Sequence, residues 1–190
     1  MSPAVRKFDR VFLVEDARGC GEDVFVLDED IRAHNRDLAM KVHSKQLSPG
    51  KVVQVIIYPT GGVRGRRVYV EVGDSTWDGL PWPDDLCLSR WFPRGAHSVR
   101  CFAFAGKYPD CQADYCLIVA EESVGSVPNF SVQCQLSYHL RGNVIVARYS
   151  DEDRLGIVSV GRSDVLCVND ALDSWLSVNM PQRSLSGHGE

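Results

Sequence analysis

The stretch KVVQVIIY, residues Lys51–Tyr58, decides the fold class. Its Val, Ile and Tyr side chains fit a pleated, half-buried surface, so the stretch predicts a strand over Val52–Tyr58. The turn residues Pro59, Gly61 and Gly62 follow it, and the apolar pattern resumes at Arg67–Val72, which predicts a second strand.

Short apolar runs of the same kind recur along most of the chain, with Gly, Pro, Asp or Asn between many of them. They predict eight more strands, at Val11–Val14, Val24–Leu27, Ser98–Ala105, Tyr115–Ala120, Phe130–Leu136, Asn143–Tyr149, Gly156–Val160 and Val165–Val168. Only Arg32–Gln46 and Asp170–Val178 suggest short helices. Ten short strands predict an all-β barrel or sandwich.

Composition narrows the class of protein. The chain has 190 residues, 44% of them hydrophobic, and a formal net charge of −4, which is ordinary for a protein with a core. No apolar run approaches the roughly 18–20 residues of a membrane helix, and Met1–Lys7 does not open a signal peptide. Seven scattered cysteines favour free thiols in a reducing compartment, so a cytoplasmic or nuclear protein is expected; four lie in apolar stretches, Cys101, Cys116, Cys134 and Cys167.

The first third of the chain resembles the cold-shock domain, a five-stranded barrel of the OB type, over about residues 5–72. Glu22–Ile31 (EDVFVLDEDI) resembles that family's second RNA-contacting strand and the turn after it, and Leu47–Val55 (LSPGKVVQV) its fourth strand. Gly65–Val72 is similar to the closing strand, and Asp9–Val14 stands in the place of the first contact strand. The chain departs from the family at Arg10, at Leu27 and in the basic insert 32–46. A weaker partial echo covers 142–172.

These patterns predict two β units: a cold-shock-like barrel at residues 1–73 and a second β-barrel or sandwich unit at 97–178. The segment 74–96 between them is rich in Trp and Pro, and we expect it to pack across the sheets on either side. The polar tail 179–190 is expected to be disordered. Whether the two units share one core, whether the chain is a fragment of a longer protein, and its oligomeric state stay open.

The first functional hypothesis is binding of single-stranded RNA, because residues 32–67 carry eight basic groups against one acidic group. The cold-shock resemblance implies stacking of bases on exposed aromatics, while the glycine-rich loop before Arg66 and Arg67 would present arginines to phosphates. The predicted contact residues are Arg10, Phe12, Phe25, Lys45, Lys51, Arg64, Arg66 and Arg67. The alternatives are that Phe12 and Phe25 point into the barrel core and that the basic window is a solvated edge.

The second hypothesis is a protein-interaction domain of a larger RNA-processing or helicase-like protein, without nucleic-acid contact. Its anchor would be the aromatic set Trp77, Trp82, Trp91 and Phe92, unless these side chains are internal. An enzyme is not expected, because the chain has no HExxH or CxxC spacing, P-loop or G-x-S-x-G elbow. No metal or cofactor is expected either. Neither ligand identity nor sequence preference follows from these patterns.

Overall fold

A computed structural model describes residues 10–12, 26–73, 79–92, 99–105, 113–120, 127–152 and 156–179; for 10–12, 99–105 and 120 it describes the backbone only. Its strands are β1 (Arg10–Phe12), β2 (Val52–Tyr58), β3 (Arg66–Glu71), β4 (Val99–Ala105), β5 (Asp114–Ala120), β6 (Val144–Tyr149) and β7 (Ile157–Val158). Its helices are α1 (Asp28–His43), α2 (Phe130–Leu136) and α3 (Asp164–Asn179), with short 3-10 turns at Pro49–Lys51 and Pro83–Asp85.

The strands form one antiparallel sheet in the order β1-β4-β5-β6-β2-β3, with β7 paired to β6. The fold is therefore mainly β, but with three helices. The predictions of strands at Val52–Tyr58, Arg67–Val72, Ser98–Ala105, Tyr115–Ala120 and Asn143–Tyr149 are confirmed within a residue of each boundary. The predicted strand Gly156–Val160 is reduced to two residues, and that at Val11–Val14 overlaps β1.

Strands from both predicted units join in this sheet. Ile57 of β2 lies opposite Ile145 of β6, and Arg10 of β1 lies opposite Cys101 of β4. Among the described strands, β1 and β3 lie at opposite ends of the sheet and do not pair, so the described strands do not close into a barrel. Residues 1–73 thus contribute strands to both ends of a shared sheet, because β4, β5 and β6 lie between them.

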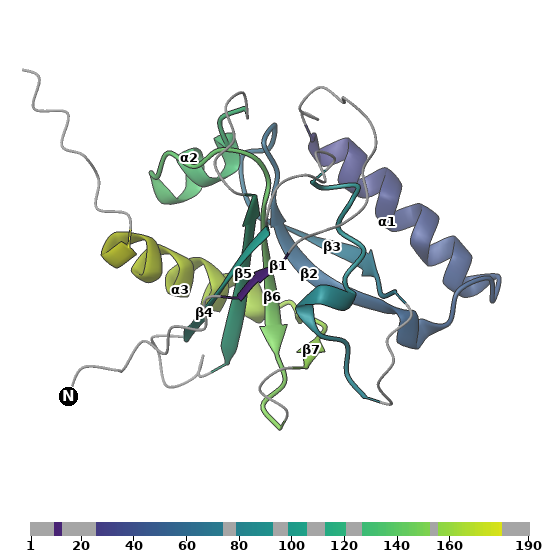
Figure 1. Cartoon of the computed structure of the whole chain (residues 1–190). Helices are drawn as coiled ribbons and strands as arrows, with labels where there is room; N and C mark the ends of the chain where they lie inside the picture. Colours follow the sequence, from purple (N-terminus) through teal and green to yellow (C-terminus); the bar gives the residue numbers. More distant parts are fainter. Residues whose placement is uncertain are drawn as a thin grey trace, which may run out of the picture.

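The sheet is covered on both faces (Figure 1). On one face Ile56, Tyr58 and Leu117 pack against α2 and α3. On the other face Val55 and Ile57 pack against α1 and the segment 79–92. Burial on both sides explains why β2 and β6 are almost continuously apolar rather than alternating.

The predicted strand Phe130–Leu136 is wrong, since these residues form α2. The side chain of Asn129 accepts a hydrogen bond from the Val132 backbone N–H, which caps the first turn of a helix. Val132 and Leu136, four residues apart, then both face the core. Tertiary packing and the cap override the strand propensity of this short run.

The predicted strand Val165–Val168 is also wrong, because it lies inside α3, which extends the helix predicted at Asp170–Val178. Val168, Ala171, Leu172 and Leu176 are buried at helical spacing. A window of four residues was too short to reveal that period.

Helix α1 confirms the short helix suggested at Arg32–Gln46 but begins earlier, at Asp28. Asp28, Glu29 and Asp30 occupy its first turn, where negative charge is favourable, and the Asp30 carboxylate accepts a hydrogen bond from the Leu27 N–H at 2.8 Å. The turn that the cold-shock resemblance implied at Asp28–Ile31 is therefore helical. Val26 and Leu27, predicted to end a strand, precede the helix without strand structure.

The cysteines only partly match the expected free thiols. Cys116 is free and buried, and Cys134 is free but exposed on α2. Cys167 is disulfide-bonded, to a partner outside the described side chains, so the prediction of a free thiol is wrong there. Within the described residues, no helix is long and apolar enough to cross a membrane.

Candidate nucleic-acid interface at the hairpin end

Residues 59–65, called the hairpin loop here, connect β2 to β3 at the end of the sheet where α1 begins and α2 lies (top of Figure 1). The N–H of Phe130 donates to the Thr60 carbonyl at 3.1 Å, and the N–H of Gly65 donates to the Gln135 side chain at 2.8 Å. The loop is therefore attached to both ends of α2.

A buried polar network below the loop holds its first half. The Thr60 hydroxyl accepts a hydrogen bond from the Val26 N–H at 3.0 Å, and the Thr60 N–H donates to the Asn143 side chain at 3.0 Å. The Asn143 amide donates in turn to the Trp91 carbonyl at 2.8 Å. Thr60 and Asn143 are 1% and 3% exposed, so these bonds form away from water, where they are strongest.

The cap residue Asn129 and Ser131 of α2 complete the network. Asn129 donates to the carbonyls of Tyr58 and Gly142, both at 2.8 Å, and the Ser131 hydroxyl donates to the Pro59 carbonyl at 2.6 Å. Since each of these bonds ends on the backbone, the network fixes the path of the loop rather than the orientation of one side chain. The loop is preorganised, as a binding element should be.

Gly62 fits this arrangement because it has no side chain. A Cβ at Gly62 would lie 2.6 Å from Pro59 Cγ and 2.7 Å from Ser131 Oγ, closer than real Cβ contacts. Neither neighbour can move cheaply, because Pro59 is a ring and Ser131 is held by its own hydrogen bond.

We expect Gly62→Ala to lower the free energy of unfolding by about 1–3 kcal/mol, the usual cost of overpacking. Urea denaturation followed by circular dichroism measures the change. Gly50→Ala is the matched control, because its Cβ would meet its nearest atom, Ser48 Oγ, at 4.0 Å. Equal stabilities of the two variants would contradict the tight packing of Gly62.

An ion pair joins the first residue of α1 to the first residue of β3, which directly follows the loop. The Arg66 guanidinium donates to the Asp28 carboxylate, and this hydrogen bond is the main reason why the pKa of Asp28 lies below its ordinary value, against the opposing effect of burial. Arg32 and Arg64 act on the same carboxyl in the same direction through their charge. Asp28 is therefore a neutralised anion surrounded by arginines.

Between α1 and the loop lies an open hollow of about 190 Å³. Seven residues line this hairpin hollow: Leu27, Asp28, Glu29, Arg32, Gly61, Gly62 and Val63. Val63 is 63% exposed, and Arg64 next to it is exposed as well. Phe130, whose backbone N–H bonds to Thr60, is 43% exposed as a residue.

The predicted RNA-contact residues do not lie together in the structure. Arg64 is exposed at the loop, but Arg66 is paired with Asp28, and Arg67 donates to Gln54 at 3.2 Å. The Lys51 ammonium donates to the Gly73 carbonyl at 3.1 Å, whereas Lys45 is exposed just after α1. Of the predicted loop arginines, Arg64 is exposed next to Val63 of the hairpin hollow, and Arg66 pairs with Asp28, which lines the hollow.

The predicted stacking residues lie elsewhere or outside the described part. Arg10 and Phe12 belong to β1, at the opposite end of the sheet from β3, and only their backbone is described. Phe25 lies outside the described residues. An interface that combines Phe12 with the loop arginines would have to span the width of the sheet.

The predicted aromatic anchor is largely internal. Trp91 is 2% exposed and packs in the core, while Trp82 and Phe92 are half-buried. Trp77 lies outside the described residues. The interpretation that these aromatics cover the sheet from inside fits Trp91.

Sequence reasoning missed Arg32 and Phe130 as neighbours of the loop. Arg32 comes from α1 and Phe130 from the cap region of α2, so no local spacing connects them to residues 59–65. The Asn129 cap, a residue type typical of helix starts, was the one signal that could have revealed α2.

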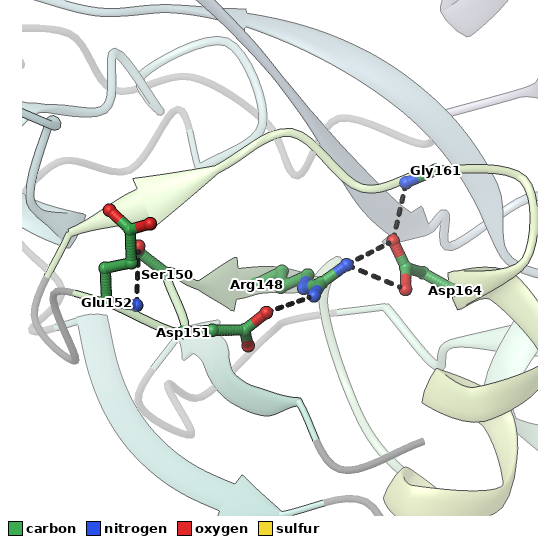
Figure 2. Close-up of polar contacts among 6 residues, drawn as sticks. All are labelled: Arg148, Ser150, Asp151, Glu152, Gly161 and Asp164. Atoms are coloured by element: carbon green, nitrogen blue, oxygen red, sulfur yellow. Dashed lines mark hydrogen bonds and ion pairs between the residues drawn. The ribbon is translucent and has the colours of Figure 1, made fainter. Parts of the chain in front are cut away.

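A second polar cluster lies where α3 begins (Figure 2). Arg148 of β6 donates to both oxygens of Asp164 at 3.3 Å and to Asp151 at 3.0 Å, and Asp164 also accepts the Gly161 N–H at 2.6 Å. Burial, with a smaller contribution from Asp164, raises the pKa of nearby Tyr115 to about 12. Because the two carboxylates already occupy the guanidinium, this cluster attaches α3 to the sheet rather than offering a site to an anion.

No group of three or more His, Cys, Asp or Glu side chains suited to a metal ion occurs among the described residues. Comparison of the chain with protein-family models, with curated proteins and with solved structures finds no match. The cold-shock resemblance therefore stays a prediction.

Proposed function

We propose that this protein is a non-catalytic binding module that holds single-stranded RNA at the hairpin end. The observation that carries the proposal is a rigid loop that presents Arg64, with Arg32 across the hairpin hollow from the loop and exposed Phe130 beside the loop. Of the cold-shock resemblance, the proposal keeps the turn and strand at Leu47–Tyr58 and the strand at Arg66–Glu71.

Three exposed arginines supply the proposed phosphate contacts. Arg32 and Arg36 lie one turn apart on α1, and Arg64 lies on the loop. Within the described part of the chain, none of the three forms a hydrogen bond or an ion pair, so their guanidinium groups are open to bidentate contact with phosphate.

Local charge also supports an anionic ligand. Arg66 neutralises Asp28, and the Asp30 carboxylate is turned back to the Leu27 N–H. Glu29 is the carboxylate of the hollow that opposes the arginines, so Glu29→Gln is expected to tighten RNA binding.

Phe130 is the proposed stacking residue. It lies on the solvent side of α2, while Ser131 and Gln135 of the same helix bond to the loop. One base stacked on this ring would contribute roughly 1–3 kcal/mol, and stacking of this kind requires an unpaired base. The competing aromatic anchor has less support, because Trp91 is buried.

Fluorescence anisotropy with a labelled single-stranded RNA tests the proposal. We expect binding that weakens with salt, and Arg32→Ala/Arg64→Ala should make the slope of log K against log salt about 1.4 less steep, at roughly 0.7 per lost phosphate contact. Phe130→Leu should weaken binding of the single strand and leave that slope unchanged.

The control is Arg90→Ala/Arg162→Ala, which removes two exposed arginines distant in sequence from the hairpin end and changes the net charge equally. Equal losses in the two double variants would show that only net charge matters. Absence of binding at low salt would overturn the proposal, and salt-tolerant capture of a protein partner would replace it with the protein-interaction function.

A further inference from the structure

Strand β3 is the terminal strand of the sheet at the α1 side. Strand β2 pairs with one edge of β3, so the backbone groups on the other edge of β3 point outward. Unsatisfied edges of this kind template pairing with another strand, so proteins usually block them.

Helix α1 blocks this edge with a side-chain amide. Asn35 Nδ2 donates to the Arg67 carbonyl at 3.1 Å, and Asn35 Oδ1 accepts the Tyr69 N–H at 2.9 Å. One residue of a parallel strand would make the same two bonds, to residues two apart on its neighbour. Asn35 therefore occupies the place of a missing strand.

His34 satisfies the next group along the edge. Its Nε2 lies 2.8 Å from the Tyr69 carbonyl, and its ring packs edge-to-face on Trp91 at 5.0 Å between centroids. Burial lowers the pKa of His34, so the neutral ring is the donor at neutral pH. Beyond it the Cys87 N–H donates to the Glu71 carbonyl at 2.9 Å.

We propose that the outer edge of β3 is a docking edge for β3 of a second copy of this chain, and that Asn35 and His34 keep it closed. Helix α1 covers this edge in the monomer. Its displacement converts the monomer into a dimer joined by a continuous sheet.

The sequence of β3 argues for a second copy as the occupant. Two antiparallel β3 strands related by a two-fold axis at Tyr69 place Arg67 opposite Glu71 of the second copy, and the reverse pair follows by symmetry. Opposite charges and aromatic pairs that face each other across strands stabilise a sheet.

In the monomer, both charged side chains of this pattern already have partners. Lys41 of α1 pairs with Glu71 at 3.6 Å, and Arg67 donates to Gln54. Displacement of α1 frees the Glu71 carboxylate and the outward backbone groups of Arg67 and Tyr69 together. Pairing with a second copy further requires that the Glu71 carbonyl leave the Cys87 N–H and that Arg67 leave Gln54.

The test is sedimentation velocity of the full chain over a range of concentrations. We expect Asn35→Ala to tighten dimerisation about tenfold or more, because two edge groups lose their partner. Arg67→Glu in that background should abolish the dimer through repulsion by Glu71 of the second copy. Adding Glu71→Arg should restore it, because the swap recreates the opposite pairs.

The control is Met40→Ala, which changes an exposed residue of the same helix and should leave the protein as monomeric as the parent. A folded Asn35→Ala variant that stays monomeric overturns the proposal, as does a dimer that the charge swap does not restore. Should Asn35→Ala fail to fold, Asn35→Asp retains the acceptor for the Tyr69 N–H and removes the donor; a dimer restored by the same charge swap then supports the proposal, and a folded monomer overturns it.

Discussion

Replacing Asn129 with alanine is expected to lower the free energy of unfolding by about 3–5 kcal/mol, since it leaves two buried groups and one half-buried group without this partner, at roughly 1–3 kcal/mol for each buried group. The side chain is 1% exposed; it donates to the carbonyls of Tyr58 and Gly142 and accepts the Val132 N–H, all at 2.8 Å. It joins β2, the start of β6 and α2, so its loss loosens the hairpin loop as well. Chemical denaturation measures the stability.

Two further variants separate the cap from the network. Asn129→Ser keeps a capping oxygen but not the amide donors, so it should recover only part of the loss, about 1 kcal/mol. Gln133→Ala, an exposed position on the same helix, should change stability by no more than about 0.5 kcal/mol. A loss from Asn129→Ala as small as that of Gln133→Ala would contradict the role assigned to the network.

The second large effect is expected for Asp164→Ala, which should cost about 3 kcal/mol because it leaves a largely buried guanidinium without its buried partner. The Asp164 side chain is 11% exposed and that of Arg148 is 26% exposed. The variant also loses the bond from the Gly161 N–H at the start of α3. Urea denaturation followed by circular dichroism measures this loss.

Asp151→Ala provides a control on the same guanidinium. Asp151 is 70% exposed, and ion pairs with exposed partners contribute roughly 0–1 kcal/mol. If the two aspartates proved equally costly, burial would not be the reason for the effect of Asp164.

The sequence predicted the central strands well, because a strand such as Val52–Tyr58 is encoded by its own β-branched and aromatic residues. It predicted Arg64 as an exposed arginine of the loop, but it could not predict that Arg66 pairs with Asp28, 38 positions away. Likewise, the composition of 74–96 indicated an aromatic segment, whereas the hydrogen bond from Asn143 to the Trp91 carbonyl ties that segment into the network below the loop.

By itself, then, the sequence determined that the chain is mainly β and which central segments are strands, since strand propensity is a local property of each run. The tertiary structure decided that Phe130–Leu136 and Val165–Val168 are helical, because a short apolar run adopts the period that the surface it covers demands. It also decided where β1 and β3 lie in the sheet, and therefore which charges meet. Pairing order depends on contacts between residues distant in the chain, and no local pattern records them.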